Sequence, residues 1–329
     1  MTGSSHHIAI FGRALAPKAM ALAQRAGVRV TTTDSYLRGA DLNEFMARER
    51  PDAIILRLGE VTDAAMACSP NLKIVAKHGV GYDTIDIEAA NRRGVLVTIA
   101  RGGNTISVAE HALALMLGVA RGIAHLDARI RGGHWDKATY LGTELNGKTL
   151  GIVGYGAIGH ALANICKALG MGVVVYDPAL PASVQIYHPR VDTLDELLAN
   201  ADVISLHCPL TPATRNMIST PQLEKMRKGA ILINTARGGL IDIEALTEAL
   251  ATGVIGGAGL DTFPAEPPQL SAEMTALTNL VVSPHVGAST VEAGERVGVL
   301  AMTLVLDCLA GRPVDSAYVV NDVISGRVA

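Results

Sequence analysis

The segment TLGIVGYGAIGHALANICKALGMGVVVYDP, residues 149–178, has three glycines within six positions and then a run of Ala, Leu and Ile. Gly154, Gly156 and Gly159 form a G-x-G-x-x-G pattern between a strand-like and a helix-like run, and a second strand-like run closes the segment. The first glycine permits a tight turn, the second lets a phosphate approach the backbone, and the third lets the helix pack on the strand. The free N–H groups at the start of the helix, together with the helix dipole, favour the negative charge of a bound phosphate. The segment predicts a dinucleotide-binding unit, although glycines that serve only a turn are the plainer alternative.

Asp177 follows Gly159 by 18 residues, at the end of the second strand-like run. A carboxylate at this place accepts hydrogen bonds from the ribose hydroxyls of the adenosine and repels a 2′-phosphate. Residues 177–185 contain no arginine that would bind such a phosphate. The sequence therefore predicts NAD rather than NADP as the cofactor.

Short β-branched runs alternate with Ala/Leu-rich runs before residue 100, and the alternation begins again at 149. This order predicts two α/β domains, each with a doubly wound parallel sheet, and a cleft between them. The apolar segment 107–120 is either a buried crossover helix or a link between domains that also forms a subunit interface. Residues 301–321 predict a helix, a turn and a short edge segment that returns to the first domain.

The composition of the 329-residue chain excludes several classes of function. Hydrophobic residues make up 49%, charged residues 18%, and the net charge is −3, which gives no electrostatic basis for binding nucleic acid or an anionic membrane. The longest apolar stretch, 111–120, is about half a membrane span. The four cysteines lie far apart, without metal-ligand spacing, and no signal peptide is evident at the start. We expect a soluble cytoplasmic protein with reduced thiols and no metal site.

Seven motifs, in order and spacing, resemble the D-isomer-specific 2-hydroxyacid dehydrogenases, which include phosphoglycerate, hydroxypyruvate and glyoxylate enzymes. The motifs are KHGVGYDTID (77–86), NTISVAEHALALML (104–117), GYGAIG (154–159), LHCPLT (206–211), INTARGG (233–239), LDTFPAEP (260–267) and SPHVGAS (283–289). The resemblance implies a Rossmann NAD-binding domain, residues 103–291, inserted into a flavodoxin-like substrate domain formed by residues 1–102 and 292–329. It also implies a homodimer.

Three residues of these motifs suit the transfer of a hydride from a carbon that bears a hydroxyl. His285 is the expected acid/base because imidazole titrates near neutral pH. By the resemblance, Glu266 fixes the tautomer of the histidine, and Arg237 binds the substrate carboxylate and polarises the carbonyl. Each residue alone could be a surface charge or a structural histidine, so the prediction depends on their joint occurrence after the glycine turn.

The resemblance also implies contacts with the cofactor and the substrate. The cofactor set is Gly154, Gly156, Ala157, Ile158, Gly159, Asp177, Cys208, Thr235, Ala236, Asp261, His285, Gly287 and Ala288. The substrate set is Arg57, His78, Gly79, Val80, Gly81 and Arg237. Asp261 is expected to accept a hydrogen bond from the nicotinamide end of NAD. Cys208 is expected to be a small residue in the wall of the cofactor site rather than a reactive thiol. Gly59 stands where some phosphoglycerate-type members have a second basic residue, which argues against a phosphate-bearing substrate.

The predicted function is that of an NAD-dependent oxidoreductase acting on a small D-2-hydroxy acid or its 2-keto partner. One alternative is a D-3-phosphoglycerate dehydrogenase proper. Another is an NAD-sensing binding protein that resembles the corepressors with this fold. Formate dehydrogenases pair the histidine with glutamine, so Glu266 argues against that group.

Overall fold

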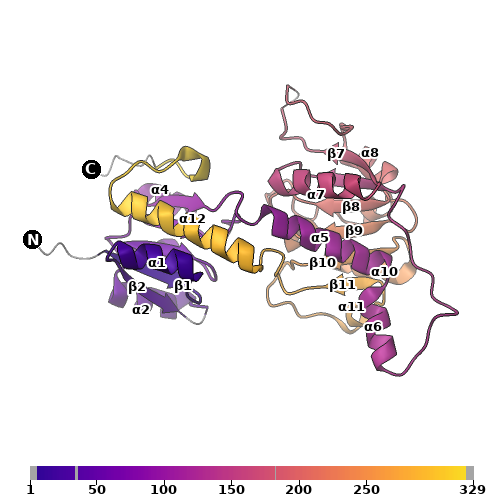
Figure 1. The fold of residues 1–329 in the computed structure, drawn as a ribbon, viewed down its shortest axis with the longest axis horizontal. Coiled ribbons are helices and arrows are strands. Elements are labelled where there is room, and N and C mark those ends of the chain that lie inside the picture. Colours follow the sequence, from indigo (N-terminus) through magenta and orange to yellow (C-terminus); the bar gives the residue numbers. More distant parts are fainter. Residues whose placement is uncertain (1–5, 34–35, 182, 324–329) are drawn as a thin grey trace, which may run out of the picture. The chain divides into compact units, whose positions relative to one another are not determined.

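The computed structural model describes residues 6–33, 36–181 and 183–323 (Figure 1). The chain divides into two compact units. Unit 1 consists of Met1–Asn104 and Ser289–Ala329, and unit 2 of Thr105–Ala288. The sequence analysis placed the two points at which the chain passes between the domains after residues 102 and 291. Unit 1 is thus assembled from both ends of the chain, and unit 2 is continuous.

Unit 1 contains a five-stranded parallel sheet in the order β2-β1-β3-β4-β5, which is the flavodoxin-like order. The strands are β1 (His7–Phe11), β2 (Arg29–Thr33), β3 (Ala53–Leu56), β4 (Ile74–Lys77) and β5 (Leu96–Ile99). β3 is apolar at every position, and β1 at every position after His7, because helices cover both faces of the sheet.

Alternate residues of these strands enter two separate cores. Ile8, Ile10 and Ile55 pack with helices α1 (Pro17–Arg25) and α12 (Val291–Leu309). Phe11 and Leu56 pack on the other face, against α2 (Gly39–Glu49), α3 (Asp63–Ala67) and α4 (Ile87–Arg93). Unit 1 is therefore a three-layer α/β domain.

The last described segment returns to the edge of this sheet, as the sequence predicted. After α12 and the 3₁₀ helix η2 (Ser316–Tyr318), Val319 forms an antiparallel bridge with Thr98 of β5. The Val320 N–H donates to the carbonyl of Val97 at 3.0 Å. The chain after α12 therefore covers part of the β5 edge.

Unit 2 contains a six-stranded parallel sheet in the order β11-β10-β9-β8-β6-β7. The strands are β6 (Thr149–Val153), β7 (Gly172–Tyr176), β8 (Val203–Leu206), β9 (Ile231–Asn234), β10 (Gly257–Leu260) and β11 (Leu280–Val282). Arg190 forms a parallel bridge with Val175 of β7 and so marks a rudimentary further strand. When this segment is counted as a strand, the order from it through β7, β6, β8 and β9 to β10 is the Rossmann order 3-2-1-4-5-6. β11 then extends the sheet beyond β10.

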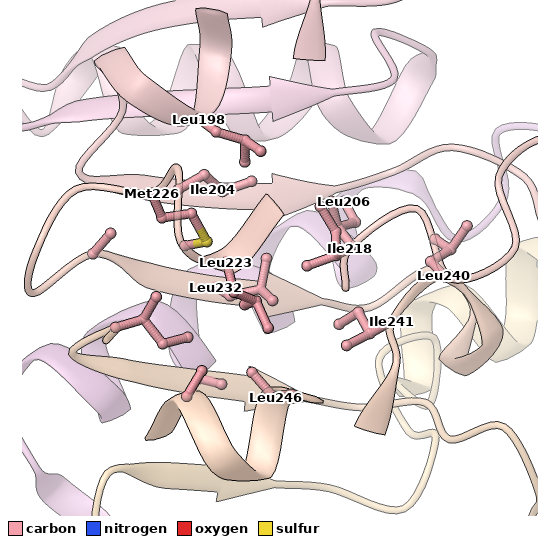
Figure 2. Close-up of a cluster of buried hydrophobic side chains, with 14 of the residues drawn as sticks. Leu198, Ile204, Leu206, Ile218, Leu223, Met226, Leu232, Leu240, Ile241 and Leu246 are labelled. Atoms are coloured by element: carbon pink, nitrogen blue, oxygen red, sulfur yellow. The ribbon is translucent and has the colours of Figure 1, made fainter. Parts of the chain in front are cut away.

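Helices cover both faces of the second sheet. Helices α5 (Thr105–Ala120) and α7 (Ala157–Ala168) share one core with the sheet. On the other face, the core shown in Figure 2 contains residues of α8 (Leu194–Asn200), α9 (Thr220–Leu223) and α10 (Ile243–Thr252). The remaining elements are α6 (Ile123–Arg131), η1 (Gly238–Leu240) and α11 (Ala272–Ala276).

Helix α5 is the first element of unit 2 and directly follows the point where the chain leaves unit 1, so it is partly buried but does not cross between two strands of one sheet. Its residues Ala109, Ala112, Leu115 and Met116 are buried in the core of this unit. In the part of the chain that the structure describes, no single helix is long and apolar enough to cross a membrane. Helices α5 and α6 meet those criteria only together, and they are bent by 60° relative to each other.

Candidate active site

The glycine turn between β6 and α7 leaves open space at the start of the helix. Gly154 has φ +93°, and a Cβ there would lie 2.8 Å from the Cys208 nitrogen. A Cβ on Gly159 would lie 2.3 Å from the Gly154 carbonyl oxygen. A Cβ on Gly156, in contrast, would have no atom of the described residues within 4 Å. The first and third glycines therefore permit close packing, and the second leaves room for a diphosphate at the N-terminus of α7.

A cavity of about 400 Å³ lies beside this turn. It is lined by Tyr155, Gly156, Ala157, His160, Leu180, Val184, Gln185, Ile186 and Tyr187. Asp177 follows β7, and its carboxylate accepts hydrogen bonds from the N–H groups of Tyr155 (2.8 Å) and Ala179 (2.9 Å). The glycine turn, the helix start and the carboxylate together fit the diphosphate and ribose of a dinucleotide.

The guanidinium of Arg190 lies at the backbone of Asp177, a contact that the sequence analysis missed. Its Nη2 donates to the Asp177 carbonyl at 3.0 Å. The residue lies beyond the segment 177–185, and it reaches Asp177 because its own segment pairs with β7. The pairing of its segment with β7, which a local sequence pattern does not specify, brings it to Asp177.

His285 and Glu266 form a hydrogen-bonded pair in unit 2. The His285 Nδ1 lies 2.8 Å from Glu266 Oε2, and the Phe263 N–H donates to Glu266 Oε1 at 3.1 Å. Burial raises the pKa of Glu266, but hydrogen bonds from His285 and Phe263 and the charges of His285 and Arg237 lower it by more. The carboxylate is ionised at neutral pH, so it accepts a hydrogen bond from the Nδ1–H group and directs Nε2 away from itself.

The loop that carries His285 is anchored on a buried carboxylate. Asp261, at the end of β10, is 1% exposed and accepts from Ser283 Oγ (2.6 Å) and from the N–H groups of Val286 (2.9 Å) and Gly287 (2.8 Å). The His285 N–H donates to the Asp261 carbonyl at 2.8 Å. His285 itself has φ +54°, a backbone conformation that is uncommon for a residue with a side chain. Asp261 therefore fixes the loop that carries His285.

His111 of α5 extends this network, and the sequence analysis gave it no role. Its Nε2 lies 2.8 Å from Ser283 Oγ and 3.3 Å from Asp261 Oδ1. The available signal was a histidine within the otherwise apolar part of motif 104–117. The hydrogen bonds join α5 to the loop that carries His285.

Arg237 lies in a turn packed against the backbone of the Glu266 loop. Asn234, at the end of β9, holds this turn through the Ala236 N–H (3.0 Å) and the Arg237 carbonyl (2.8 Å). A Cβ on Gly238 would lie 1.9 Å from the backbone carbon of Phe263. Only glycine allows so close an approach. This close packing of the two backbones brings the guanidinium of Arg237 near enough to Glu266 to lower the pKa of the Glu266 carboxyl.

The other residues predicted to contact the cofactor lie at strand ends or in the first turn of α7. Ala157 and Ile158 begin α7. Burial raises the pKa of the Cys208 thiol to about 11, so it is protonated at neutral pH. The Thr235 hydroxyl is buried and has no hydrogen-bond partner within the described residues. Gly287 and Ala288 end unit 2, and a Cβ on Gly287 would crowd Asp261 Oδ2 at 2.9 Å.

The predicted substrate residues other than Arg237 lie in unit 1, after strands β3 and β4. Arg57 follows β3 directly, and His78 follows β4. Gly79 has φ +151°, and its N–H donates to the Lys77 carbonyl at 2.9 Å. The N–H groups of Val80 and Gly81 have no acceptor within residues 6–33, 36–181 and 183–323. These two amides, rather than that of Gly79, are available to an anion.

Comparison with known proteins identifies the family. Residues 113–287 match the family described as "D-isomer specific 2-hydroxyacid dehydrogenase, NAD binding domain". A D-3-phosphoglycerate dehydrogenase of Archaeoglobus fulgidus is 43% identical over 279 residues, which are 83% of this chain and 53% of that protein. The chain thus spans about half the length of the curated relatives it matches.

Solved structures match over nearly the whole chain. The TT0316 protein of Thermus thermophilus is 37% identical, with a TM-score of 0.86 over 95% of this chain and 99% of that one. A glyoxylate reductase of Paecilomyes thermophila is 28% identical, with a TM-score of 0.84 over 96% of this chain and 98% of that one. From the matched domain, the fold and the identity to these proteins, the chain belongs to the D-isomer-specific 2-hydroxyacid dehydrogenase family, and unit 2 contains its NAD-binding domain.

Proposed function

We propose that the protein is an NAD-dependent oxidoreductase that interconverts a small D-2-hydroxy acid and its 2-keto acid. The observation that carries the proposal is the pair formed by His285 Nδ1 and Glu266 Oε2 at 2.8 Å, in the same unit as the glycine turn. We further propose that it works in the cytoplasm. The four cysteines are free, as is typical of proteins in a reducing compartment, and this supports the proposal.

His285 acts as the acid/base in this proposal. With Nδ1 hydrogen-bonded to an ionised carboxylate, Nε2 accepts the hydroxyl proton during oxidation and returns it during reduction. The positive charge that develops on the ring is stabilised by Glu266, whose second oxygen is held by the Phe263 N–H. The side chain of His285 is 49% exposed, which leaves Nε2 accessible to a substrate.

Arg237 and the loop after β4 bind the substrate in this proposal. A guanidinium is permanently charged and planar, so it holds a carboxylate and polarises the adjacent carbonyl. The N–H groups of Val80 and Gly81 offer two further donors to a carboxylate. NAD supplies the hydride acceptor when bound. Asp177 favours it over NADP, because a second negative charge beside the carboxylate is repelled.

A substrate panel tests the proposal. The purified protein is given NADH or NADPH together with glyoxylate, hydroxypyruvate or pyruvate, and the absorbance of the reduced cofactor is followed. We expect turnover with at least one keto acid at about 1–10³ s⁻¹. We also expect kcat/KM to be at least about tenfold lower with NADPH, equivalent to about 1.4 kcal/mol. Tight NADH binding without turnover of any keto acid would instead support the binding-protein alternative.

We also propose that two copies of the chain associate through α6 and the segment that follows it. Every residue of α6 is at least partly exposed, including Ile123 and Ile130. Trp135 and Leu141, in the following segment, are 77% and 94% exposed. Large exposed apolar side chains gathered in one part of a chain are typical of an interface. A second copy of the same surface would cover them.

Replacing Ile123 with glutamate should convert the dimer to a monomer at micromolar concentration, because two buried, unpaired charges would face the interface. Light scattering coupled to gel filtration measures the mass directly. The matched control is Val254→Glu, which places the same charge at a partly exposed residue after α10. A wild-type protein that elutes as a monomer would contradict the proposal.

A further inference from the structure

Helix α5 packs closely on strand β10, with one face of the helix following one face of the strand. A Cβ on Gly259 of β10 would lie 2.9 Å from the Leu115 Cβ, so the missing side chain lets the helix approach the sheet there. His111 precedes Leu115 by one helical turn, and Asp261 follows Gly259 by two residues. Both spacings keep a side chain on the same face of its element. The packing at Gly259 therefore brings the imidazole of His111 to Asp261, where Nε2 lies 3.3 Å from Oδ1.

The directions of the hydrogen bonds at Ser283 follow from the charge of Asp261. Burial raises the pKa of Asp261, but hydrogen bonds involving His111, Ser283 and two backbone N–H groups lower it by more, so the carboxyl is ionised at neutral pH. An ionised carboxylate only accepts, so Ser283 Oγ donates its single hydrogen to Asp261 Oδ1, at 2.6 Å. His111 Nε2 lies 2.8 Å from the same Oγ and must therefore be the donor in that contact.

The hydrogen bond from His111 sets the orientation of the Ser283 hydroxyl. A serine hydroxyl is free to rotate about its Cβ–Oγ bond until its partners fix it. Within residues 6–33, 36–181 and 183–323, His111 is the only group that donates to this oxygen. With the lone pairs of Oγ turned toward α5, its hydrogen is directed at Asp261. His111 thus holds Ser283 in the state in which it stabilises the buried carboxylate.

The same carboxylate holds the backbone around His285. It accepts hydrogen bonds from the N–H groups of Val286 and Gly287, the two residues that follow His285. His285 has φ +54°, and a residue with a side chain keeps such a conformation only where its surroundings impose it. The distance of 2.8 Å between His285 Nδ1 and Glu266 Oε2 depends on this backbone conformation. A displaced Asp261 carboxylate would therefore displace the imidazole of His285.

We propose that His111 is a positioning residue for the acid/base, which it holds in place by donating a hydrogen bond to Ser283 and so fixing Asp261. The inference rests on the proposed 2-hydroxyacid dehydrogenase function and adds a residue to its machinery. His111 acts through Ser283 and Asp261 and does not itself transfer the proton. An apolar side chain would serve a contact that only packs α5 on the sheet, as Leu115 does one turn further along the helix.

Two amide substitutions at His111 test this role in the full-length protein. The amide nitrogen of glutamine reaches the place of Nε2, whereas that of asparagine reaches only the place of Nδ1, so only His111→Gln keeps a donor for Ser283. We expect kcat for the preferred keto acid to fall roughly tenfold in His111→Asn, as for the loss of one hydrogen bond in a buried network, and at most about threefold in His111→Gln. The KM for the keto acid should change little in either variant, because His111 is not expected to bind the substrate.

The matched control is Glu110→Asn, which places asparagine at the neighbouring, exposed position of α5. It should keep the wild-type kcat. Equal losses of kcat in His111→Gln and His111→Asn would overturn the proposal, because the donor to Ser283 would then be irrelevant.

A double-mutant cycle shows whether His111 acts through Ser283. Ser283→Ala should lower kcat by a factor similar to that of His111→Asn, and the two changes together should cost less than about twofold more than either alone. With NADH deuterated at C4 of the nicotinamide, the isotope effect on kcat should be larger in His111→Asn than in the wild type, because a displaced acid/base slows the chemical step relative to product release. Fully multiplicative losses in the double variant, or an unchanged isotope effect, would contradict the proposal.

Hydrogen exchange followed by mass spectrometry provides a measurement that does not require turnover. The N–H groups of Val286 and Gly287 donate to Asp261, so we expect the segment 283–288 to exchange roughly tenfold faster in His111→Asn than in the wild type. His111→Gln and Glu110→Asn should exchange like the wild type. If keto acids are reduced but this segment exchanges equally in all variants, the inference fails while the dehydrogenase function stands. If no keto acid is turned over, the dehydrogenase function fails, and the exchange rates still decide whether His111 holds the loop.

Discussion

Replacing His285 with asparagine should lower kcat/KM for the preferred keto acid by about 10²- to 10⁴-fold, the range associated with general acid–base groups. The amide of asparagine can still reach Glu266, but it cannot accept or release a proton near neutral pH. The variant therefore removes proton transfer and leaves the surrounding hydrogen bonds largely satisfied. Steady-state rates with saturating NADH measure the effect.

The control for this variant is His134→Asn, which makes the same chemical change at an exposed histidine after α6. Its rate should match the wild type. Circular dichroism and the Tm of both variants should also match, because His285 is exposed and few core contacts depend on it. A fully active His285→Asn protein would show that another group transfers the proton.

Replacing Asp261 with asparagine should lower the stability of unit 2 by about 2–4 kcal/mol and reduce activity by more than tenfold. The carboxylate accepts from Ser283 Oγ and from two backbone N–H groups, so all of its partners are donors. An asparagine must turn an NH₂ group toward at least one of these donors, and the loop of His285 must move to relieve the conflict. Urea unfolding and steady-state kinetics measure the two effects.

The effect of Asp261→Asn should also depend on pH. Burial raises the pKa of Asp261, but hydrogen bonds involving His111, Ser283 and the two backbone N–H groups lower it below the ordinary value. A carboxyl with a lowered folded-state pKa contributes stability above its unfolded pKa, near 4, and loses it as the pH falls. The difference in stability between the wild type and the variant should therefore be largest at pH 7 and shrink below about pH 4. A constant difference across this range would contradict the assignment of an ionised, loop-anchoring carboxylate.

The matched control is Asp242→Asn. Asp242 is the N-cap of α10, and its carboxylate accepts a hydrogen bond from the Ala245 N–H at 3.1 Å. Asparagine caps a helix about as well as aspartate, so this change should alter stability by only a few tenths of a kcal/mol. Equal losses in the two variants would show that the effect of Asp261→Asn comes from a lost negative charge in general rather than from the loop.

The sequence was sufficient for features that depend on short, contiguous patterns. The glycine turn needs residues of given size at fixed spacing within one strand–helix unit, so Gly154, Gly156 and Gly159 could be located directly. His285, Glu266 and Arg237 were predicted from motifs, and the structure places Glu266 beside His285 and near Arg237. The fold class followed from the regular alternation of strands and helices.

Features that depend on which strands are neighbours could not be predicted in this way. Arg57 Nη1 donates to the carbonyl of Arg13, 44 residues away, because β1 lies beside β3. Arg190 approaches Asp177 only because its segment pairs with β7. His111 reaches Ser283 because α5 packs against β10 and β11 of the unit 2 sheet. In each case the contact follows from sheet order and register, which no local pattern specifies.

The discontinuity of unit 1 has a consequence for the order in which the protein folds during synthesis. Ile8, Ile10, Ile55 and Ile74 are covered on one face by Ala301, Met302 and Val305 of α12. Until the ribosome has made these last residues, that face of the first sheet has no complete cover. Unit 2 is continuous and can complete its core earlier, although it is made later than the strands of unit 1. The first strands to leave the ribosome are thus the last to be enclosed, and the nascent chain exposes an apolar sheet face for most of its synthesis.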